Sequence, residues 1–497
     1  MSFNSLAFLI FLPVVLILYY VLPHKARWVM LLLASYIFYT YWNFNLIFLI
    51  LTTTLVSYLS GILIEKTDKK GLKTFYLIFT LVVCLGILIF FKYFNFLSHS
   101  VTALIRLFGG EAVDFTLDLI LPVGISFYTF QTLSYVIDIY REQIKAEKHL
   151  GYFALYVSFF PQLVAGPIER PENLLPQLKE EHKLDKNNLL IGFRMMIGGF
   201  TKKVVIADTL AIFVDRVFNS TDISNVTGLA VLIGAILFLF QIYCDFSGYS
   251  DIATGCARML GINLTENFKQ PLLVESISDV WSRWHITLNS WFSDYIYTPL
   301  NQKAMGKKHI KLRIYINLLI VFLISGLWHG ANWTFFVWGA VNGTLIVLHE
   351  ILKKPKKKLY KKLNLKINNP KTKWLRIIGT NTIVAIVLII FRSRSVTDAF
   401  TFYGKLFSNY SFDASYFKNT FDLLDFSIVN FITALLLCVL IFPLDKYIIT
   451  PRGNDIISFE KDRSINTYYF YLIWLIAIAW ILLLSLGQSH GFIYFQF

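Results

Sequence analysis

One long apolar run limits most strongly how this chain can fold. From Ile314 to His349 the sequence contains no Asp, Glu, Lys or Arg. As a single helix the run would be about 54 Å long, which exceeds a hydrocarbon core of about 30 Å. The run must therefore break, and the tetrapeptide HGAN at 329–332 supplies the breaker. The break is either a turn at the outer surface or an irregular segment at membrane depth, enclosed by protein or beside a water-filled cavity.

The composition extends this picture to the whole chain. Of the 497 residues, 56% are hydrophobic and only 15% are charged, and the mean hydropathy is +0.58. Soluble domains carry about 25% charged residues, so the chain is predicted to be an all-α polytopic protein of the lipid bilayer. The net charge of +15 lies in clusters between apolar runs. The positive-inside rule explains such clusters better than nucleic-acid binding does, and no nucleic-acid partner is expected.

About 11–12 membrane spans are expected, some of them broken or re-entrant. The segment 115–140 contains the helix-breaking sequence LPVG, 152–166 is too short for a simple span, and 189–218 carries Arg194, Lys202 and Lys203. The candidate spans are 6–22, 28–42, 45–64, 74–97, 115–140, 189–218, 226–250, 314–329, 332–351, 375–392, 426–444 and 468–486.

Loop charges predict the orientation. The connections 65–73, 302–313 and 353–363 are strongly basic, whereas the stretch 411–425 is net acidic. Placing the three basic loops in the cytoplasm is compatible with alternating spans and puts both termini outside. The first apolar stretch lacks a small-residue cleavage site, so it is interpreted as an uncleaved span. The four cysteines include no CxxC pair, and neither a disulfide framework nor a metal site is expected.

Six of the eleven tryptophans fall between positions 281 and 338, together with two histidines that each follow a tryptophan. Within 278–300, Trp281, Trp284, Leu288 and Trp291 recur at helical spacing, which predicts one amphipathic helix with a cap at Ser278 or Asp279 and Pro299 near its end. His285 and Asn289 would be neighbours on that helix.

His329 lies deep in the apolar run, and two explanations are open. A lone histidine in a membrane helix often serves as a hydrogen-bonding partner for another helix. Intramembrane ionisable residues also mark functional sites, and histidine can take and return a proton near neutral pH. The chain contains no GxSxG, HExxH, Walker or GxGxxG motif that would supply a different chemistry.

Several long segments resemble a known family. QIYCDFSGYSDIA (241–253), SDVWSRWHITLNSWFSDYIYTPL (278–300) and SGLWHGANWTFFVWGAVNG (325–343) appear in an order similar to that of the membrane-bound O-acyltransferases. LPVGISFYTFQTLSYVIDIYR (121–141) and FFPQLVAGPIERP (159–171) resemble the bacterial branch that O-acetylates alginate and peptidoglycan. The resemblance implies one integral-membrane domain over 1–497, a motif-bearing core at about 115–352, and helices around a central tunnel. Ser293 departs from the pattern, because relatives usually carry a basic residue there.

The resemblance also implies roles for individual residues. His329 corresponds to the catalytic histidine, and His285 to the second histidine or asparagine position of the family. No metal or bound cofactor is implied. The residues expected to line the tunnel or to support the site are Trp328, Asn289, Arg283, Asp294 and Asp245.

In that family branch, an acetyl group passes from cytoplasmic acetyl-CoA across the bacterial cytoplasmic membrane to an extracytoplasmic polysaccharide, often through an esterase-like partner protein. A histidine within membrane depth would let donor and acceptor meet without either crossing the bilayer. Two alternatives are open. The chain could transfer D-alanine from an acyl-carrier protein for teichoic acid modification, or it could be a non-catalytic polysaccharide export or scaffold protein.

Overall fold

A computed structural model describes residues 1–362, 369–408 and 410–449, and this part of the chain is helical without any β-strand. The helices form two compact units. The first unit contains residues 1–196 and 249–265, and the second contains residues 197–248 and the described residues from Glu266 to Ile449. The helices α8 (Lys186–Phe200) and α10 (Gly228–Met259) contribute to both units. The prediction of an all-α polytopic membrane protein is confirmed.

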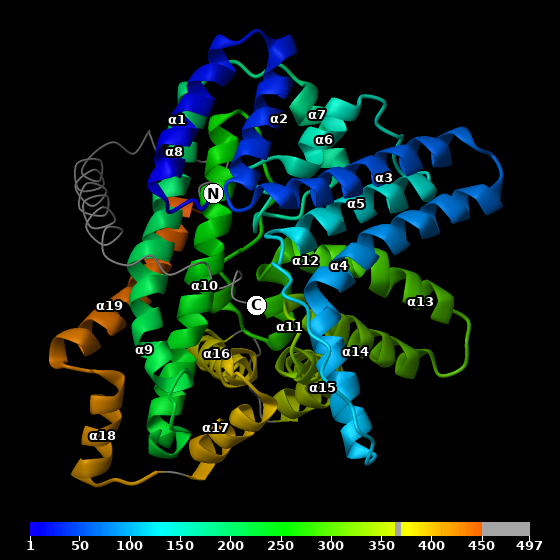
Figure 1. The fold of residues 1–497 in the computed structure, drawn as a ribbon. Helices are drawn as coiled ribbons and strands as arrows, with labels where there is room; N and C mark the ends of the chain where they lie inside the picture. Colours follow the sequence, from blue (N-terminus) through cyan, green and yellow to red (C-terminus); the bar gives the residue numbers. More distant parts are fainter. Residues whose placement is uncertain (363–368, 409, 450–497) are drawn as a thin grey trace. The chain divides into compact units, whose positions relative to one another are not determined.

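The first unit is formed by the N-terminal helices (Figure 1). The long helix α3 packs against both α4 and α5, and α2 packs against α6. Besides the parts of α8 and α10, its helices are α1 (Leu6–Val21), α2 (His24–Thr40), η1 (Phe44–Leu46), α3 (Ile47–Lys66), α4 (Lys70–Leu107), α5 (Ile125–Tyr140), α6 (Leu150–Ser158) and α7 (Pro171–Lys179).

The predicted span 115–140 is wrong in its first part. Residues 110–122 are not helical, and α5 begins only at Ile125. Gly124 precedes the helix with φ +76°, a left-handed conformation that glycine adopts without steric cost. A Cβ at this position would lie 2.4 Å from the Leu163 carbonyl oxygen. The LPVG sequence therefore does not kink a helix. It separates the non-helical segment 110–122 from the buried helix α5.

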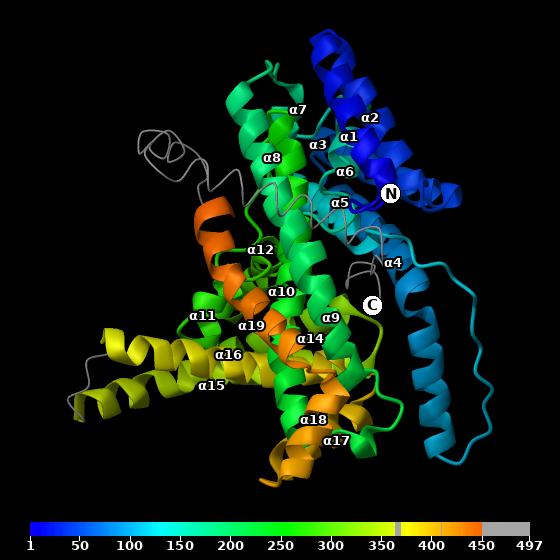
Figure 2. The same ribbon diagram turned by 90° about the vertical axis from the view of Figure 1, so that its left-hand side faces the viewer.

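The second unit holds the remaining helices. The pair α14 and α15 makes the most extensive helix contact, and α16 packs along α15, as Figure 2 shows. Its elements are η2 (Thr201–Ala207, a π-helix), α9 (Asp208–Phe218), η3 (Ile223–Asn225), η4 (Pro271–Leu273), α11 (Ile277–Arg283), α12 (Ile286–Phe292), η5 (Ser293–Tyr297, a π-helix), α13 (Thr298–Ala304), α14 (Ile310–His329), α15 (Trp333–Lys362), α16 (Pro370–Arg392), α17 (Val396–Ser408), α18 (Ala414–Leu424), α19 (Ile428–Pro443) and η6 (Leu444–Ile449, a π-helix).

The predicted break of the long apolar run is confirmed. Helix α14 ends at His329, and α15 begins at Trp333. Trp328, His329 and Gly330 at this break are buried within the unit. The two helices approach closely because Gly326 faces Gly339, where a Cβ on Gly326 would lie 3.1 Å from the Cα of Gly339 and 2.3 Å from the Phe335 carbonyl oxygen. Small residues permit such contacts between membrane helices.

Two other expectations are corrected. The stretch 278–300 is not one helix, because the chain leaves the helical conformation at Trp284 and His285 and restarts at Ile286. Ser276, rather than Ser278 or Asp279, caps the first part, and Pro299 lies in the first turn of α13. The basic stretch 353–363 is not a loop, because α15 continues to Lys362.

Seven helices in the described part of the chain are long and apolar enough to cross a membrane, and α1 is a shorter apolar helix. They match the predicted spans at 45–64, 74–97, 226–250, 314–329, 332–351, 375–392 and 426–444. The segments 28–42 and 189–218 are helical but do not meet these criteria, since α2 has only 17 residues and η2 carries two buried lysines. The predicted span 468–486 lies outside the described residues.

The close contact of α14 and α15 yields a stability prediction. Gly326→Ala should force the helices apart and cost about 1–3 kcal/mol, as overpacking does elsewhere. Thermal unfolding of the purified protein in detergent measures this loss. Gly379→Ala is the matched control, because a Cβ at this position on α16 meets nothing within 4 Å. An unchanged midpoint for Gly326→Ala would contradict the importance of the contact.

Candidate functional site

His329 is the last residue of α14, and it lies inside an aromatic cluster of the second unit. Its side chain is only 7% exposed. The ring centroid lies 5.0 Å from that of Trp328, 5.1 Å from that of Trp338 on α15 and 5.4 Å from that of Phe391 on α16. Three helices thus hold the imidazole, and Gly330 allows the turn because a Cβ there would collide with the Phe335 ring.

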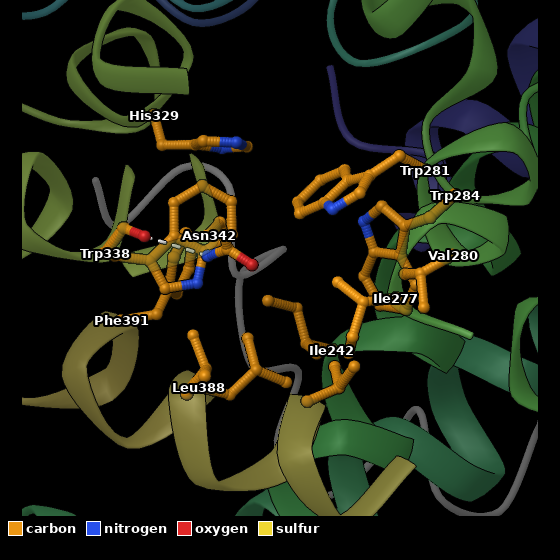
Figure 3. Close-up of a pocket in the computed structure, with 12 residues that line it drawn as sticks. Ile242, Ile277, Val280, Trp281, Trp284, His329, Trp338, Asn342, Leu388 and Phe391 are labelled. Atoms are coloured by element: carbon orange, nitrogen blue, oxygen red, sulfur yellow. Dashed lines mark hydrogen bonds between the residues drawn. The ribbon is translucent and has the colours of Figure 1, made fainter. Parts of the chain in front are cut away.

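The imidazole of His329 lines a cavity of about 40 Å³. A buried water needs about 10–15 Å³, so the cavity is small but large enough for a small group. Figure 3 shows His329 and Trp338 on one side and Trp281 and Trp284 on the other. The remaining lining residues are Ile242, Ile277, Val280, Asn342, Val384, Val387, Leu388 and Phe391, and none of the twelve is acidic.

Asn342 on α15 is a polar residue of the cavity lining. Its amide nitrogen donates to the Trp338 carbonyl oxygen at 2.8 Å. With the nitrogen engaged, the amide oxygen points into the cavity (Figure 3). The cavity therefore offers an imidazole and an amide oxygen within an otherwise apolar and aromatic lining.

The opposite wall comes from the break after α11. The amide nitrogen of Asn289 donates to the carbonyl oxygens of Trp281 at 2.8 Å and Trp284 at 2.6 Å. These bonds satisfy carbonyls that lose helical partners where α11 ends. The Trp281 indole N–H is buried and has no acceptor among the described residues, although it belongs to the cavity wall. An unpaired buried donor costs free energy unless a ligand supplies the acceptor.

His285 is the residue directly before α12, and its backbone has a left-handed φ of 47°. The side chain is 2% exposed, and its Nδ1 lies 3.1 Å from Oδ1 of Asn267. Its ring contacts Phe246 at 4.7 Å and Trp328 at 5.6 Å between centroids. Burial, followed by the nearby His329, lowers the pKa of His285 well below its ordinary 6.5. His285 is therefore neutral at physiological pH, and the Trp328 ring contacts both histidine rings.

The other predicted residues lie apart from the cavity lining. Asp245 accepts an ion pair from Lys203 at 2.5 Å, and both side chains are buried. Arg283 pairs with Asp279 one helical turn earlier at 3.2 Å. Asp294 is exposed on η5. Asn289 supports the tryptophan wall through the backbone, as described above, and none of these four lines the cavity.

Sequence reasoning missed several members of the site. Trp338, Asn342 and Phe391 line the cavity, and Asn267 contacts His285. Trp338 and Asn342 lie four residues apart on α15, in the segment VWGAVNG. This spacing places them on one helix face and could have been recognised in the sequence. Asn267 lies in a connecting segment without periodicity, and no local signal marks it. Among the described residues, no group of three His, Cys, Asp or Glu could hold a metal ion.

Comparisons with known proteins identify the family of this chain. A family model, "MBOAT, membrane-bound O-acyltransferase family", matches residues 34–359. The chain is 36% identical to the probable alginate O-acetylase AlgI of Pseudomonas putida over 100% of both chains. It is 35% identical to the peptidoglycan O-acetyltransferase of Helicobacter pylori over 70% of each chain. It is 27% identical to the teichoic acid D-alanyltransferase of Bacillus subtilis, over 54% of this chain and 66% of that one.

The length of these matches and the shared enzyme class make the chain an acyltransferase that takes its acyl group from a donor. This multi-pass membrane protein belongs to the membrane-bound O-acyltransferase family.

Proposed function

We propose that this chain takes an acetyl group from cytoplasmic acetyl-CoA and passes it across the bacterial cytoplasmic membrane for O-acetylation of an extracytoplasmic polysaccharide. An esterase-like protein outside the membrane receives the group and completes the transfer. The names of the alginate and peptidoglycan relatives support acetylation of a polysaccharide. The observation that carries the proposal is His329, buried at a helix break and facing a small apolar cavity.

His329 acts as the general base. The acceptor hydroxyl loses its proton to the imidazole while its oxygen attacks the thioester carbonyl carbon. When the carbon–sulfur bond breaks, the proton passes from the imidazole to the departing thiolate, so the histidine is regenerated. A transient acyl-histidine is the alternative route. The oxygen of Asn342 points into the same cavity and can accept a hydrogen bond from the protonated imidazole or from another donor of the bound substrate.

The developing oxyanion needs a hydrogen-bond donor. The Trp281 indole N–H is suited to this role because it lies in the cavity wall and lacks an acceptor among the described residues. Trp281 and His329 both contact the ring of Trp338, at 5.8 Å and 5.1 Å between centroids. A donor aimed at developing negative charge in a dry site contributes strongly to the rate.

The cavity favours acetyl over D-alanyl transfer. The lining residues leave only a small space beside His329, which suits an acetyl group better than a larger acyl group. A D-alanyl group adds an ammonium, which would be desolvated beside His329 without a carboxylate in the lining. Burying an unpaired charge costs several kcal/mol. The lower identity to the D-alanyltransferase agrees with this preference. A role in export or as a scaffold would not require a buried histidine that is enclosed by aromatic rings and faces a cavity.

The first test is His329→Ala. Loss of the base should reduce acetyl transfer by about 10²- to 10⁴-fold, and by more if the histidine is acylated. The measurement is transfer from labelled acetyl-CoA in proteoliposomes, with polysaccharide acetylation in cells as a second readout. His309→Asn is the control, because this exposed histidine lies in the turn before α14. Acetyl transfer near the wild-type rate by a folded His329→Ala protein would refute the assignment.

The second test separates the two histidines. His285 lies behind Trp328 rather than in the cavity lining, so His285→Ala should raise KM for acetyl-CoA more than it lowers kcat. His329→Ala should show the opposite balance. Initial rates over a range of acetyl-CoA concentrations measure both parameters. Equal loss of turnover at saturating donor would mean that the two histidines form one catalytic unit.

The third test removes only the indole N–H. Trp281→Phe keeps an aromatic wall, and its kcat should fall by about 10²- to 10³-fold with little change in KM, as expected for an oxyanion donor. Trp374→Phe is the matched control on α16, where the indole is 60% exposed. A kcat within twofold of wild type for Trp281→Phe would exclude the indole from transition-state stabilisation.

A further inference from the structure

Asn267 is held against the break at His285 by its main chain. It lies between α10 and η4, and its side chain is 2% exposed. Its carbonyl oxygen accepts from the Ile286 N–H at 2.9 Å, and two residues later the Lys269 N–H donates to the Arg283 carbonyl oxygen at 2.9 Å. Two short backbone stretches therefore lie alongside each other, and the position of Asn267 relative to His285 is fixed.

The side chain of Asn267 faces three donors. Its Oδ1 accepts from the Thr287 N–H at 3.3 Å and from the Thr287 hydroxyl at 2.9 Å. A backbone N–H can only donate, so the amide atom that faces it is the oxygen. The same oxygen lies 3.1 Å from Nδ1 of His285. Because an amide oxygen carries no hydrogen, Nδ1 must supply the proton of this bond.

This bond determines the tautomer of His285. A neutral imidazole has one protonated nitrogen, so a proton on Nδ1 leaves Nε2 with a lone pair. The two nitrogens lie on different edges of the ring, and Nε2 therefore points away from Asn267. The surroundings keep the ring neutral, since burial and His329 both lower the pKa of His285.

Several titratable groups lie on the elements around His285. On α14, His329 contributes to the lowered pKa of His285, and the Trp328 ring contacts both imidazoles. On α10, Asp245 precedes the contacting Phe246 but is paired with Lys203. On α11, Arg283 is paired with Asp279. Glu266 adjoins Asn267 in the chain and is half-buried. Asp245 and Arg283 are thus engaged with other side chains, and Nδ1 of His285 bonds to the amide of Asn267.

We propose that Asn267 is a positioning residue of the acyl-transfer site, which fixes His285 in the tautomer that presents Nε2 as a hydrogen-bond acceptor beside His329. Protonation of His285 would remove this acceptor and add a positive charge next to the histidine that must take up a proton. The inference rests on the proposed function for its kinetic consequence, but the tautomer itself can be observed without any assay of transfer.

The kinetic experiment compares two substitutions of Asn267. Asn267→Asp keeps the accepting oxygen but places a carboxylate against Nδ1–H, which favours the imidazolium form. The acid limb of the kcat/KM profile for acetyl-CoA should move to higher pH by about 1–3 units, while activity at pH values above that limb is retained. Asn267→Leu cannot accept the bond, so kcat/KM should fall by about tenfold or more at every pH, as when a catalytic histidine takes the wrong tautomer.

Asn419→Asp, on the exposed face of α18 in the same unit, is the matched control for the added charge and should leave the profile unchanged. If Asn267→Asp and Asn267→Leu lose activity equally without a shift of the acid limb, Asn267 is only a structural residue and the inference is overturned. If the wild-type protein transfers no acetyl group, the proposed function fails, and the tautomer measurement decides the inference.

That measurement is solid-state nitrogen NMR of the full chain in lipid bilayers with ¹⁵N-labelled histidine. The His285 signals are identified by their loss in His285→Ala. The expected result is a protonated Nδ1 and an unprotonated Nε2 in the wild type, with this pattern lost in Asn267→Leu. A wild-type ring protonated on Nε2 alone, or on both nitrogens at neutral pH, would overturn the inference.

Discussion

The close contact between α14 and α15 is the packing interaction on which the site depends. Gly326 and Gly339 let the two backbones approach within ordinary van der Waals distance, and this approach brings the end of α14 against Trp338. A helix that ends inside a membrane protein exposes carbonyl groups that need partners. The break at 329–332 is tolerated because protein surrounds it, and it leaves His329 at the end of α14 against Trp338 and Phe391.

The opposite wall of the cavity lies where the stretch 278–300 breaks between α11 and α12. Hydrogen bonds of two asparagines stabilise this break. Asn289 bonds the carbonyls of Trp281 and Trp284, and Asn267 bonds the segment that restarts at Ile286. The left-handed conformation of His285 costs about 1–3 kcal/mol, so it persists only where neighbouring bonds determine it. The resulting wall presents two indoles to the cavity instead of the single hydrophobic stripe that an uninterrupted helix would offer.

The two buried lysines of η2 form ion pairs with carboxylates that are distant in the sequence. Lys202 and Lys203 lie within the expected span 189–218, and both side chains are buried. Lys202 pairs with Asp445 at 2.6 Å, and Lys203 pairs with Asp208 at 2.8 Å and with Asp245. The partners come from positions up to 243 residues away in the chain, 445 against 202, and no local pattern could have identified them. Asp245 accordingly has an electrostatic task in this unit that the sequence did not reveal.

Composition and local chemistry were enough to predict an all-helical membrane protein, most of its long spans, the break at HGAN and the two histidines beside tryptophans. These follow because the cost of exposing polar groups to hydrocarbon acts residue by residue. Only the tertiary structure decided that 278–300 is broken, that Trp338, Asn342 and Phe391 enclose His329, and that Asn267 orients His285. Those outcomes depend on hydrogen bonds and ring contacts between distant segments. The spacing of Trp338 and Asn342 marks one helix face but not its partners, and no local pattern marks Asn267.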